Sequence, residues 1–160
     1  MSVAERFSDL TYRFYGAIRH RGSWDLAEGP VGASDFGHLA GHKYALLITY
    51  REGGSGVPTP VWFGLADGKV YVHTERRTAK VKRIEANPRV RLAPCTMRAK
   101  PKGPAAEGRA RVLPEGEEAR AEDVIQDNYG FARKVYEAPL EGSSLDFIYL
   151  EIAPAGGGGS

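Results

Sequence analysis

An Asp67–Gly68 pair stands between two short apolar segments that end at Leu65 and begin again at Val70. Both central residues of a type I′ turn need positive φ angles, which Asp and Gly tolerate better than most residues. Such a two-residue turn joins neighbouring antiparallel strands, whereas parallel strands need a long crossover. The pair therefore predicts a β-hairpin and makes an antiparallel sheet the starting point for the fold.

Other short apolar segments extend this sheet to about six strands. The segment 44–50 is apolar on both faces, which is typical of a central strand. Pro58 and Pro60 remove two backbone donors on the same side of the next strand, so that side should face a sheet edge, a bulge or a ligand. Short connections without repeated βαβ units favour a small closed or split antiparallel barrel. The other expected strands are 57–65, 70–74, 89–93, 107–113 and 145–152.

Helices are expected beside the sheet. The segment 7–18 has apolar residues three and four positions apart with arginines between them, which predicts an amphipathic packing helix. The Gly-rich segment 22–32 is interpreted as a connector. Ser34 or Asp35 could cap a short helix that runs through Leu39 and ends at Gly41. Two further helical segments are 78–86, before Asn87–Pro88, and 115–136, with a break near Gly130.

The length of 160 residues fits one ordinary domain. Residues 1–32 are expected to form a helical extension and connector, and residues 33–153 a split β-barrel domain. Residues 154–160 have the composition of a flexible Gly-rich tail. The sequence does not say whether the terminal GGGGS is native.

The charge balance narrows the classes of partner. Lys and Arg number 22 against 20 Asp and Glu, and the net charge of +2 argues against nucleic acid. No window approaches the roughly 18 apolar residues that span a bilayer. Cys95 has no partner for an internal disulfide, and Glu5 and Asp9 interrupt the region where a signal peptide would be apolar. We therefore expect a cytoplasmic protein that binds neither nucleic acid nor membranes.

The segment 71–88 places a strand, a short basic break and the start of a helix in succession. Thr78 and Lys80 lie where that helix begins, so a hydroxyl, an ammonium group and free backbone N–H groups converge there. Together they favour an anion such as phosphate. Lys82 and Arg83 extend the positive field. Without further information, a solvated basic helix face explains these residues about equally well.

Four segments, taken together, point to a known family: VPTPVWF at 57–63, LADGKVYVHT at 65–74, TAKVKRIEANPRVRLAP at 78–94 and GPAAEGRARVL at 103–113. They resemble the split β-barrel flavin and deazaflavin oxidoreductases related to pyridoxamine 5′-phosphate oxidase. PVWF followed by Thr-x-Lys and Ala-Pro-Cys is most similar to the branch that uses coenzyme F420. The resemblance implies a mainly β fold with flanking helices, a six-stranded FMN-binding split barrel.

The resemblance also implies where a cofactor binds. Lys80 matches the lysine that reaches the cofactor phosphate, and Thr78 matches the hydroxyl beside it. The segment 60–62 matches the strand that lies along the tricyclic ring. Trp62 has an alternative role as a core residue, and Thr74 as a helix cap. The expected cofactor-binding residues are Pro60, Val61, Trp62, His73, Thr74, Thr78, Ala79, Lys80 and Lys82.

The implied activity is hydride transfer from reduced F420 to an electron-poor small molecule, in a groove at the interface of a homodimer. No side chain need act as a catalytic base. An FMN-dependent oxidase or reductase is an alternative, because the Thr-x-Lys site is common to both branches. The final strand, LDFIYLEIAP, lacks the Arg and His signature of the pyridoxamine phosphate oxidases themselves. A non-catalytic carrier of F420 or a tetrapyrrole is the alternative from another class.

The remaining reactive residues carry weaker signals. His38 and His42 are four apart, but no third ligand follows at a metal-site spacing, so no metal is expected. Cys95 lacks a neighbouring Cys or His and is expected to be a small buried hydrophobe. The absence of a Ser elbow, a Walker loop and a dinucleotide glycine motif argues against hydrolase chemistry.

Overall fold

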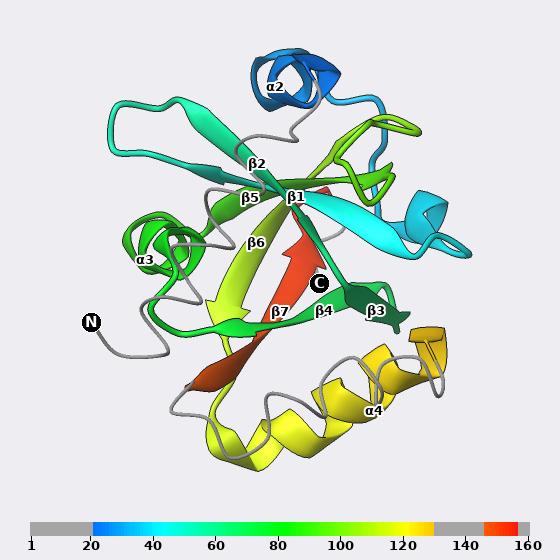
Figure 1. Ribbon diagram of the computed structural model, residues 1–160, viewed down its shortest axis with the longest axis vertical. Helices are drawn as coiled ribbons and strands as arrows, with labels where there is room; N and C mark the ends of the chain where they lie inside the picture. Colours follow the sequence, from blue (N-terminus) through cyan, green and yellow to red (C-terminus); the bar gives the residue numbers. More distant parts are fainter. Residues whose placement is uncertain (1–20, 130–145, 157–160) are drawn as a thin grey trace.

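The computed structural model describes residues 21–129 and 146–156, and its centre is an antiparallel sheet curled into a half-barrel (Figure 1). In this part of the chain the sheet has seven strands in the order β2-β1-β5-β6-β7-β4-β3. The predicted fold class, mainly β with flanking helices, is confirmed. The strands are β1 Tyr44–Tyr50, β2 Gly56–Val61, β3 Phe63–Ala66, β4 Lys69–Glu75, β5 Arg89–Cys95, β6 Ala106–Val112 and β7 Phe147–Pro154.

The sheet curls because its two edge strands follow each other in the sequence. β2 and β3 lie at opposite ends of the strand order, yet only Trp62 separates them. A flat sheet would hold these edges several strand widths apart, so one connecting residue requires the sheet to bend round on itself. The expectation of one strand over 57–65, and therefore of six strands, was wrong: the backbone leaves one edge at Trp62 and joins the other.

The closure is partial, which makes the barrel a split one. β3 pairs with β4 only as far as Phe63 opposite Val72, and the last residues of β4 pair with β7 alone. β2 pairs with β1 on one side and with no described strand on the other. Pro58 and Pro60 therefore lie on an edge strand, as their missing backbone donors predicted.

The turn chemistry of the β3–β4 hairpin is confirmed. Asp67 and Gly68 have φ angles of 54° and 77°, and they connect the pair Ala66 opposite Lys69. Two consecutive positive φ angles are what a type I′ turn requires. Gly41, expected to end the short helix before β1, also has a positive φ, of 85°.

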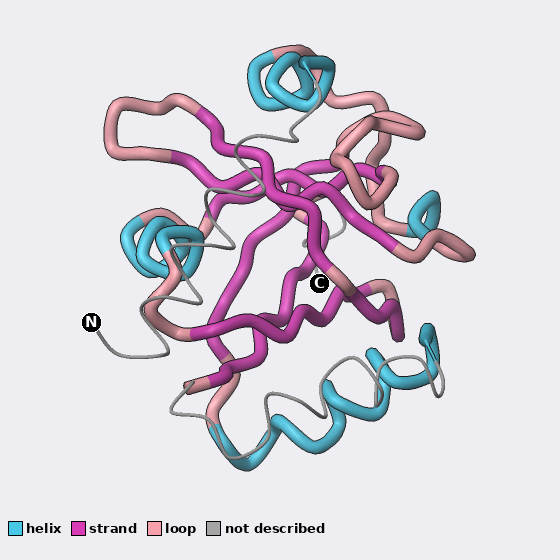
Figure 2. The backbone as a smooth tube through the Cα atoms, viewed as in Figure 1, coloured by secondary structure: helices cyan, strands magenta, loops and turns pink. Residues whose placement is uncertain are grey.

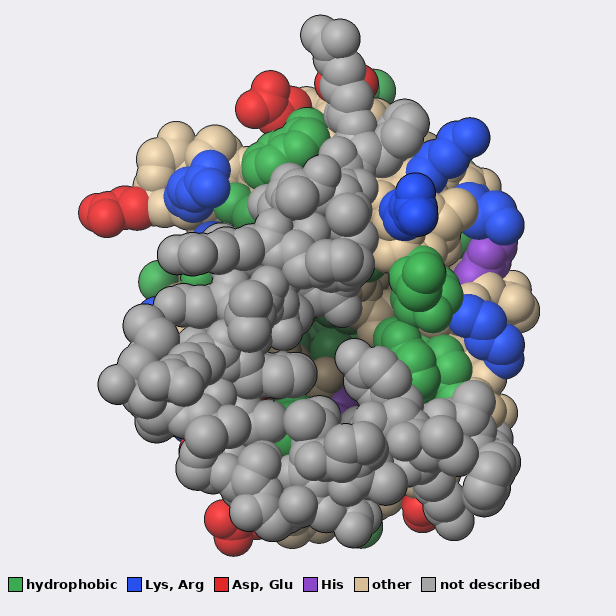
Figure 3. All heavy atoms as spheres, viewed as in Figure 1, with side chains coloured by type: hydrophobic (Ala, Val, Ile, Leu, Met, Phe, Trp, Pro, Cys, Tyr) green, Lys and Arg blue, Asp and Glu red, His purple; other side chains and the backbone are tan. Residues whose placement is uncertain are grey.

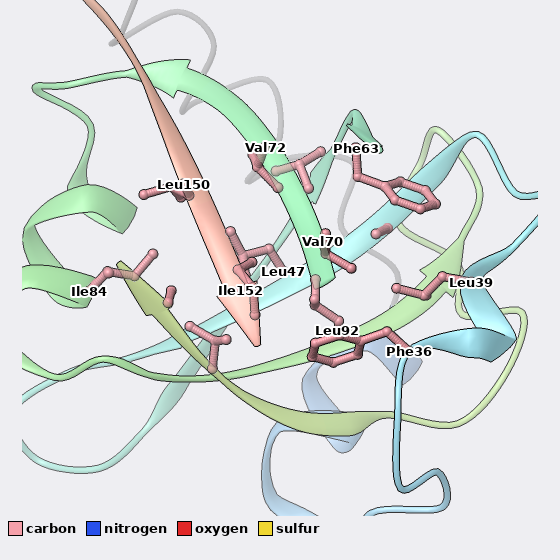
Figure 4. Packing of buried hydrophobic residues seen from close by; sticks show 14 of the residues in the cluster. Phe36, Leu39, Leu47, Phe63, Val70, Val72, Ile84, Leu92, Leu150 and Ile152 are labelled. Carbon is pink, nitrogen blue, oxygen red and sulfur yellow. The ribbon is translucent and has the colours of Figure 1, made fainter. Parts of the chain in front are cut away.

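The interior of the barrel holds the main hydrophobic core. Side chains from β1, β4, β5 and β7 point toward one another, and Figure 4 shows them interlocking. Each large aliphatic side chain buried here contributes about 1.5–3 kcal/mol to the free energy of unfolding. β1 is buried on both faces, as predicted for a central strand: Leu47 lies in this core, whereas Leu46 and Ile48 lie in a second cluster outside the barrel.

That second cluster is covered by helix α2, Arg21–Glu28, where a connector was expected. The helix forms because Leu26 and Ala27 can be buried against the outer face of β1 and β2. Arg91 donates hydrogen bonds to the carbonyls of Leu26, at 2.9 Å, and Gly29, at 2.6 Å. The hydroxyl of Tyr50 donates to the carbonyl of Ala27 at 3.0 Å. These bonds satisfy carbonyls that the end of a helix leaves without partners.

The other helices surround the barrel, as Figure 2 shows. The short helix expected to end near Leu39 is a 3-10 turn, with the Asp35 carboxylate accepting the Gly37 N–H at 2.9 Å. α3 fills one end of the barrel with Val81 and Ile84. The segments 7–18 and 130–136, part of the predicted helices, lie outside the described residues. The bounds are η1 Gly37–Leu39, α3 Ala79–Ala86, η2 Glu115–Glu117 and α4 Glu118–Tyr129.

Helix α4 packs directly on the backbone of β3, so the first prediction concerns Gly64. A Cβ atom at this position would lie 2.5 Å from the carbonyl oxygen of Val124. Gly64→Ala should lower the free energy of unfolding by roughly 1–3 kcal/mol, because helix or strand must move. Gly53, which has open space around it, supplies the control: Gly53→Ala should leave urea unfolding unchanged. Equal midpoints for the two variants would contradict this packing.

The second prediction concerns Glu107, which joins Arg89 and Arg91 beneath α2. The Arg89 guanidinium, with help from Arg91, holds the pKa of the Glu107 carboxyl below its usual range against the opposing effect of burial. Its stabilising effect should therefore be complete above about pH 4.3, the unfolded value, and fall as pH drops through the lower folded pKa. Glu107→Gln should cost about 1–3 kcal/mol in urea unfolding at pH 7.

The loss caused by Glu107→Gln should shrink when the same unfolding measurement is made in strong acid, where the wild-type carboxyl is also protonated. Glu85→Gln serves as the control, because Glu85 is exposed on α3 and forms no ion pair among the described residues. A loss of equal size at both pH values would show that Glu107 acts through packing and not through its charge.

Candidate functional site

The start of α3 is the centre of the expected phosphate site. Thr78 occupies the N-cap position, with extended φ and ψ of −71° and 154°, and its carbonyl accepts the Lys82 N–H at 3.3 Å. Ala79 and Lys80 follow in the first turn, which contains no acidic residue. Lys80 is half-buried and Lys82 is exposed. The backbone N–H groups of this turn and the Lys80 ammonium lie in one short stretch of chain, an arrangement that favours an anion.

The Thr78 hydroxyl has a different partner from the one expected. It donates to the carbonyl of Glu75 at 2.9 Å, within the turn that enters the helix. The single hydroxyl proton is engaged in this bond, so the Thr78 oxygen can accept hydrogen bonds but cannot donate one to another group. In this conformation the Thr78 hydroxyl shapes the turn, and its expected place beside a cofactor phosphate stays a prediction.

The sequence analysis missed Glu75, a carboxylate buried immediately before this turn. Its side chain is 3% exposed and accepts from the backbone N–H of Arg77 at 2.5 Å and from the Arg77 guanidinium at 2.8 Å. Arg76 forms a second ion pair, 2.8 Å from Asp146 at the start of β7. Together these contacts brace the β4–α3 connection, and Arg77 pairs with the buried Glu75 carboxylate three residues before Thr78. A buried Glu at a strand end has no sequence signal of its own.

His73 and Thr74 end β4 on opposite faces of the sheet. His73 stacks on Tyr149 with ring centroids 4.6 Å apart and lies 4.7 Å from Phe147. Thr74 has the same parity along the strand as Val72, whose side chain is in the barrel core. The structure therefore does not bring these two side chains together. Thr74 lies within β4 opposite Ile148, so the suggested role as a helix cap is wrong; Thr78 occupies the N-cap position of α3 without a capping hydrogen bond from its side chain.

The ring-binding segment 60–62 likewise divides between two faces. Val61 is buried in the barrel core, and Pro60 faces outward beside Leu46. Because proline has no N–H, pairing with β1 uses the groups of alternate residues, and the free side of β2 carries the carbonyls of Pro58 and Pro60. All of β2 is buried, Pro60 included, and Trp62 is the half-buried side chain of this segment, so the expected contact with a flat ring stays a prediction.

Trp62, the residue that connects the two sheet edges, belongs to an aromatic cluster. Its ring stacks on Tyr129 of α4, with centroids 4.4 Å apart and planes at 20°, and meets Tyr44 edge-on at 6.5 Å. Figure 3 shows hydrophobic side chains gathered right of centre, near the end of β1 and β3, with Lys and Arg beside them at the edge. Trp62 is half-buried, so part of its ring packs in this aromatic cluster, and its expected contact with a cofactor ring stays a prediction.

The end of α4 takes the place of a neighbouring strand for β3. The Tyr129 hydroxyl accepts the Phe63 N–H at 2.7 Å and donates to the Lys43 carbonyl at 2.5 Å. The side-chain amide of Asn128 donates to the carbonyls of Phe63, at 3.0 Å, and His42, at 3.2 Å. These side chains satisfy backbone groups that an edge strand exposes. The sequence analysis missed both residues, and polar residues late in a helix carry no specific signal.

The other reactive residues lie away from α3. His38 contacts the Pro104 carbonyl through Nε2 at 2.9 Å. Among the described residues no group of three or more His, Cys, Asp or Glu is placed to hold a metal ion. Cys95 is buried in the cluster under α2, as expected, and burial raises the pKa of its thiol to about 12. A thiol with this pKa is not a nucleophile near neutral pH.

Comparison with known proteins identifies the family. The family model described as pyridoxamine 5′-phosphate oxidase matches residues 36–155, and the chain belongs to this family. No protein of curated function matches the chain. None of the helices in the described residues is long and apolar enough to cross a membrane.

Solved structures share the fold at low identity. The heme storage protein HutZ from Vibrio cholerae superposes with a TM-score of 0.56 at 14% identity, over 73% of this chain and 84% of its own. A FAD-binding protein from Mesorhizobium loti gives 0.54 at 17% identity, over 74% and 83%. A structure named F420 Reductase gives 0.50 at 20% identity, over 78% and 95%. These likenesses show the split-barrel fold.

The third prediction tests the bonds between α4 and β3. Tyr129→Phe keeps the stack on Trp62 but removes the hydroxyl that joins the Phe63 N–H to the Lys43 carbonyl. Two backbone groups lose their partner, so urea unfolding should show a loss of about 1–3 kcal/mol. Tyr44→Phe is the matched control, because the Tyr44 hydroxyl forms no hydrogen bond among the described residues. Equal stability of both variants would argue that the bonds to Tyr129 contribute nothing.

Proposed function

We propose that the chain binds reduced coenzyme F420 and transfers hydride from it to an electron-poor organic acceptor. The observation that carries this proposal is the position of Lys80 in the first turn of α3, immediately after the Thr78 N-cap. That turn has no acidic residue, so its N–H groups, its dipole and the ammonium all favour a phosphate-bearing cofactor. Membership of the family and the solved F420 reductase with this fold support the choice of cofactor.

The residues of the chain fit the two ends of such a cofactor. Lys80 and the N–H groups of α3 would hold the phosphorylated stem, with Lys82 exposed alongside. The free edge of β2 would face the ring with two proline carbonyls, which accept hydrogen bonds from ring N–H groups and offer no competing donor. Trp62, held by Tyr129, would limit where the ring can lie.

When bound, F420 supplies a deazaflavin that carries a hydride, so the difficult chemistry belongs to the cofactor and not to a side chain. The protein binds it, orients it and keeps water from the reacting face. No side chain among those described is required as an acid or base. The family resemblance supports a homodimer with the cofactor groove at the subunit interface.

Two alternatives have their own support. A carrier without catalytic activity, for F420 or a tetrapyrrole, is suggested by the heme storage protein that shares the fold. An FMN-dependent enzyme is suggested by the FAD-binding relative and the family. Absorbance spectra after incubation with F420 and, separately, FMN distinguish the cofactors. Stopped-flow absorbance with reduced F420 and enones, quinones or biliverdin-like pigments distinguishes catalysis from storage, because a carrier would bind F420 without its oxidation.

The fourth prediction tests the phosphate site. Lys80→Ala removes a charge-assisted contact that typically contributes about 1.5–3 kcal/mol. The dissociation constant for F420, measured by fluorescence titration, should rise roughly ten- to a hundredfold while the fold remains intact.

Lys100→Ala is the control for this titration. Lys100 is an exposed lysine in the loop after β5, so its removal changes the net charge by the same amount without touching α3. Unchanged affinity in Lys80→Ala, or an equal loss in both variants, would reject the phosphate role of Lys80.

A further inference from the structure

A hollow lies between η1, β3 and α4, on the side of β3 away from its hairpin partner β4. A cavity of about 220 Å³ lies there, with apolar walls from Leu39, Phe63, Leu65 and Val124. Figure 4 shows Leu39 and Phe63 at the same end of the core, reaching it from η1 and β3. An engineered apolar cavity of about 150 Å³ binds benzene. This cavity therefore has room for a six-membered ring with a short substituent.

The charge on the cavity wall is negative. Asp127 is the charged residue in the lining; it is exposed at the mouth of the cavity and forms no ion pair among the described residues. The nearby cation, Lys43, has other partners: its ammonium donates to the Asn128 carbonyl and stands 5.6 Å from the centroid of the Tyr129 ring. A carboxylate beside apolar walls favours a cationic ligand and disfavours an anionic one.

The backbone of β3 adds directional groups to the cavity. The pair Ala66 opposite Lys69 closes the two-residue turn, and pairing alternates from there along the ladder. Gly64 therefore bonds to β4, whereas Phe63 and Leu65 turn their N–H and C=O groups to the free edge. Asn128 and Tyr129 satisfy those of Phe63. The Leu65 N–H and carbonyl lie on that same edge, where the cavity begins.

We propose that this cavity binds a small apolar ring carrying a primary ammonium group. The ring lies against Leu39, Phe63, Leu65 and Val124, the ammonium pairs with the Asp127 carboxylate, and the Leu65 carbonyl accepts one of its N–H bonds. A neutral ring of the same shape loses the ion pair, and an anionic one meets repulsion. This site is separate from the start of α3 and does not depend on F420.

Benzylamine, benzyl alcohol and benzoate form a matched set of probes for the protein without cofactor. Titration calorimetry should give benzylamine a dissociation constant of about 1 mM or tighter, as expected for a ligand of this size. Benzyl alcohol should bind about two- to fivefold more weakly, because it lacks the ion pair to the exposed Asp127, and benzoate should not bind. Amide NMR spectra should show the Leu65 N–H among the signals that benzylamine shifts. No binding of benzylamine at 20 mM (about twentyfold above that constant) would overturn the proposal.

Variants locate the site and separate charge from shape. Asp127→Asn should weaken benzylamine binding about two- to fivefold, the range of an exposed ion pair, and leave benzyl alcohol binding unchanged. Asp123→Asn, four residues earlier on α4 and exposed outside the cavity lining, should change neither. Ala40→Trp, which introduces a large side chain at the cavity wall, should abolish both. Equal effects of the two Asp variants would overturn the ion pair, and unchanged binding in Ala40→Trp would overturn the location.

A last comparison separates this site from the proposed function. Lys80→Ala should keep the wild-type affinity for benzylamine even though its affinity for F420 falls. Loss of benzylamine binding in that variant would contradict a site on β3 and α4. Failure of F420 to bind the wild-type protein would leave the benzylamine result intact.

Discussion

One residue, Trp62, connects the two edges of the sheet, and the rest of the structure depends on that constraint. A single connecting residue cannot span a flat seven-stranded sheet, so the strands must curl until β2 and β3 meet. The curl encloses the main core and leaves the outer face of β1 and β2 for α2 to cover. It also holds Trp62 against Tyr129, which is why α4 follows the edge of β3.

Backbone groups that no neighbouring strand pairs with indicate where ligands can bind. An edge strand exposes donors and acceptors that must find partners. On β3 the side chains of Asn128 and Tyr129 form hydrogen bonds with the backbone of Phe63 and form none with that of Leu65. On β2 prolines remove the donors and leave carbonyls. The two proposed sites therefore lie where the sheet stops pairing, in agreement with the partial closure of the barrel.

The two sites have opposite electrostatic preferences, although the chain is nearly neutral with a net charge of +2. The start of α3 combines Lys80 with helix N–H groups, and the buried Glu75 carboxylate, three residues before Thr78, is paired with Arg77. The cavity beside α4 presents Asp127, while Lys43 is held by the Asn128 carbonyl. Local pairing, and not the total charge, decides which ligand each site favours.

The sequence by itself determined the local elements, because these depend on neighbours along the chain: the Asp67–Gly68 turn, the central strand β1, the edge character of Pro58 and Pro60, and the start of α3. Its motifs also indicated the family. Only the tertiary structure decided that the segment 57–65 divides at Trp62 and that 21–28 is a helix. It also decided that the side chains of His73 and Thr74 lie on opposite faces of the sheet. It also supplied Glu75, Asn128 and Tyr129. Their partners lie at places that only the curled sheet brings together, and no spacing in the sequence encodes that proximity.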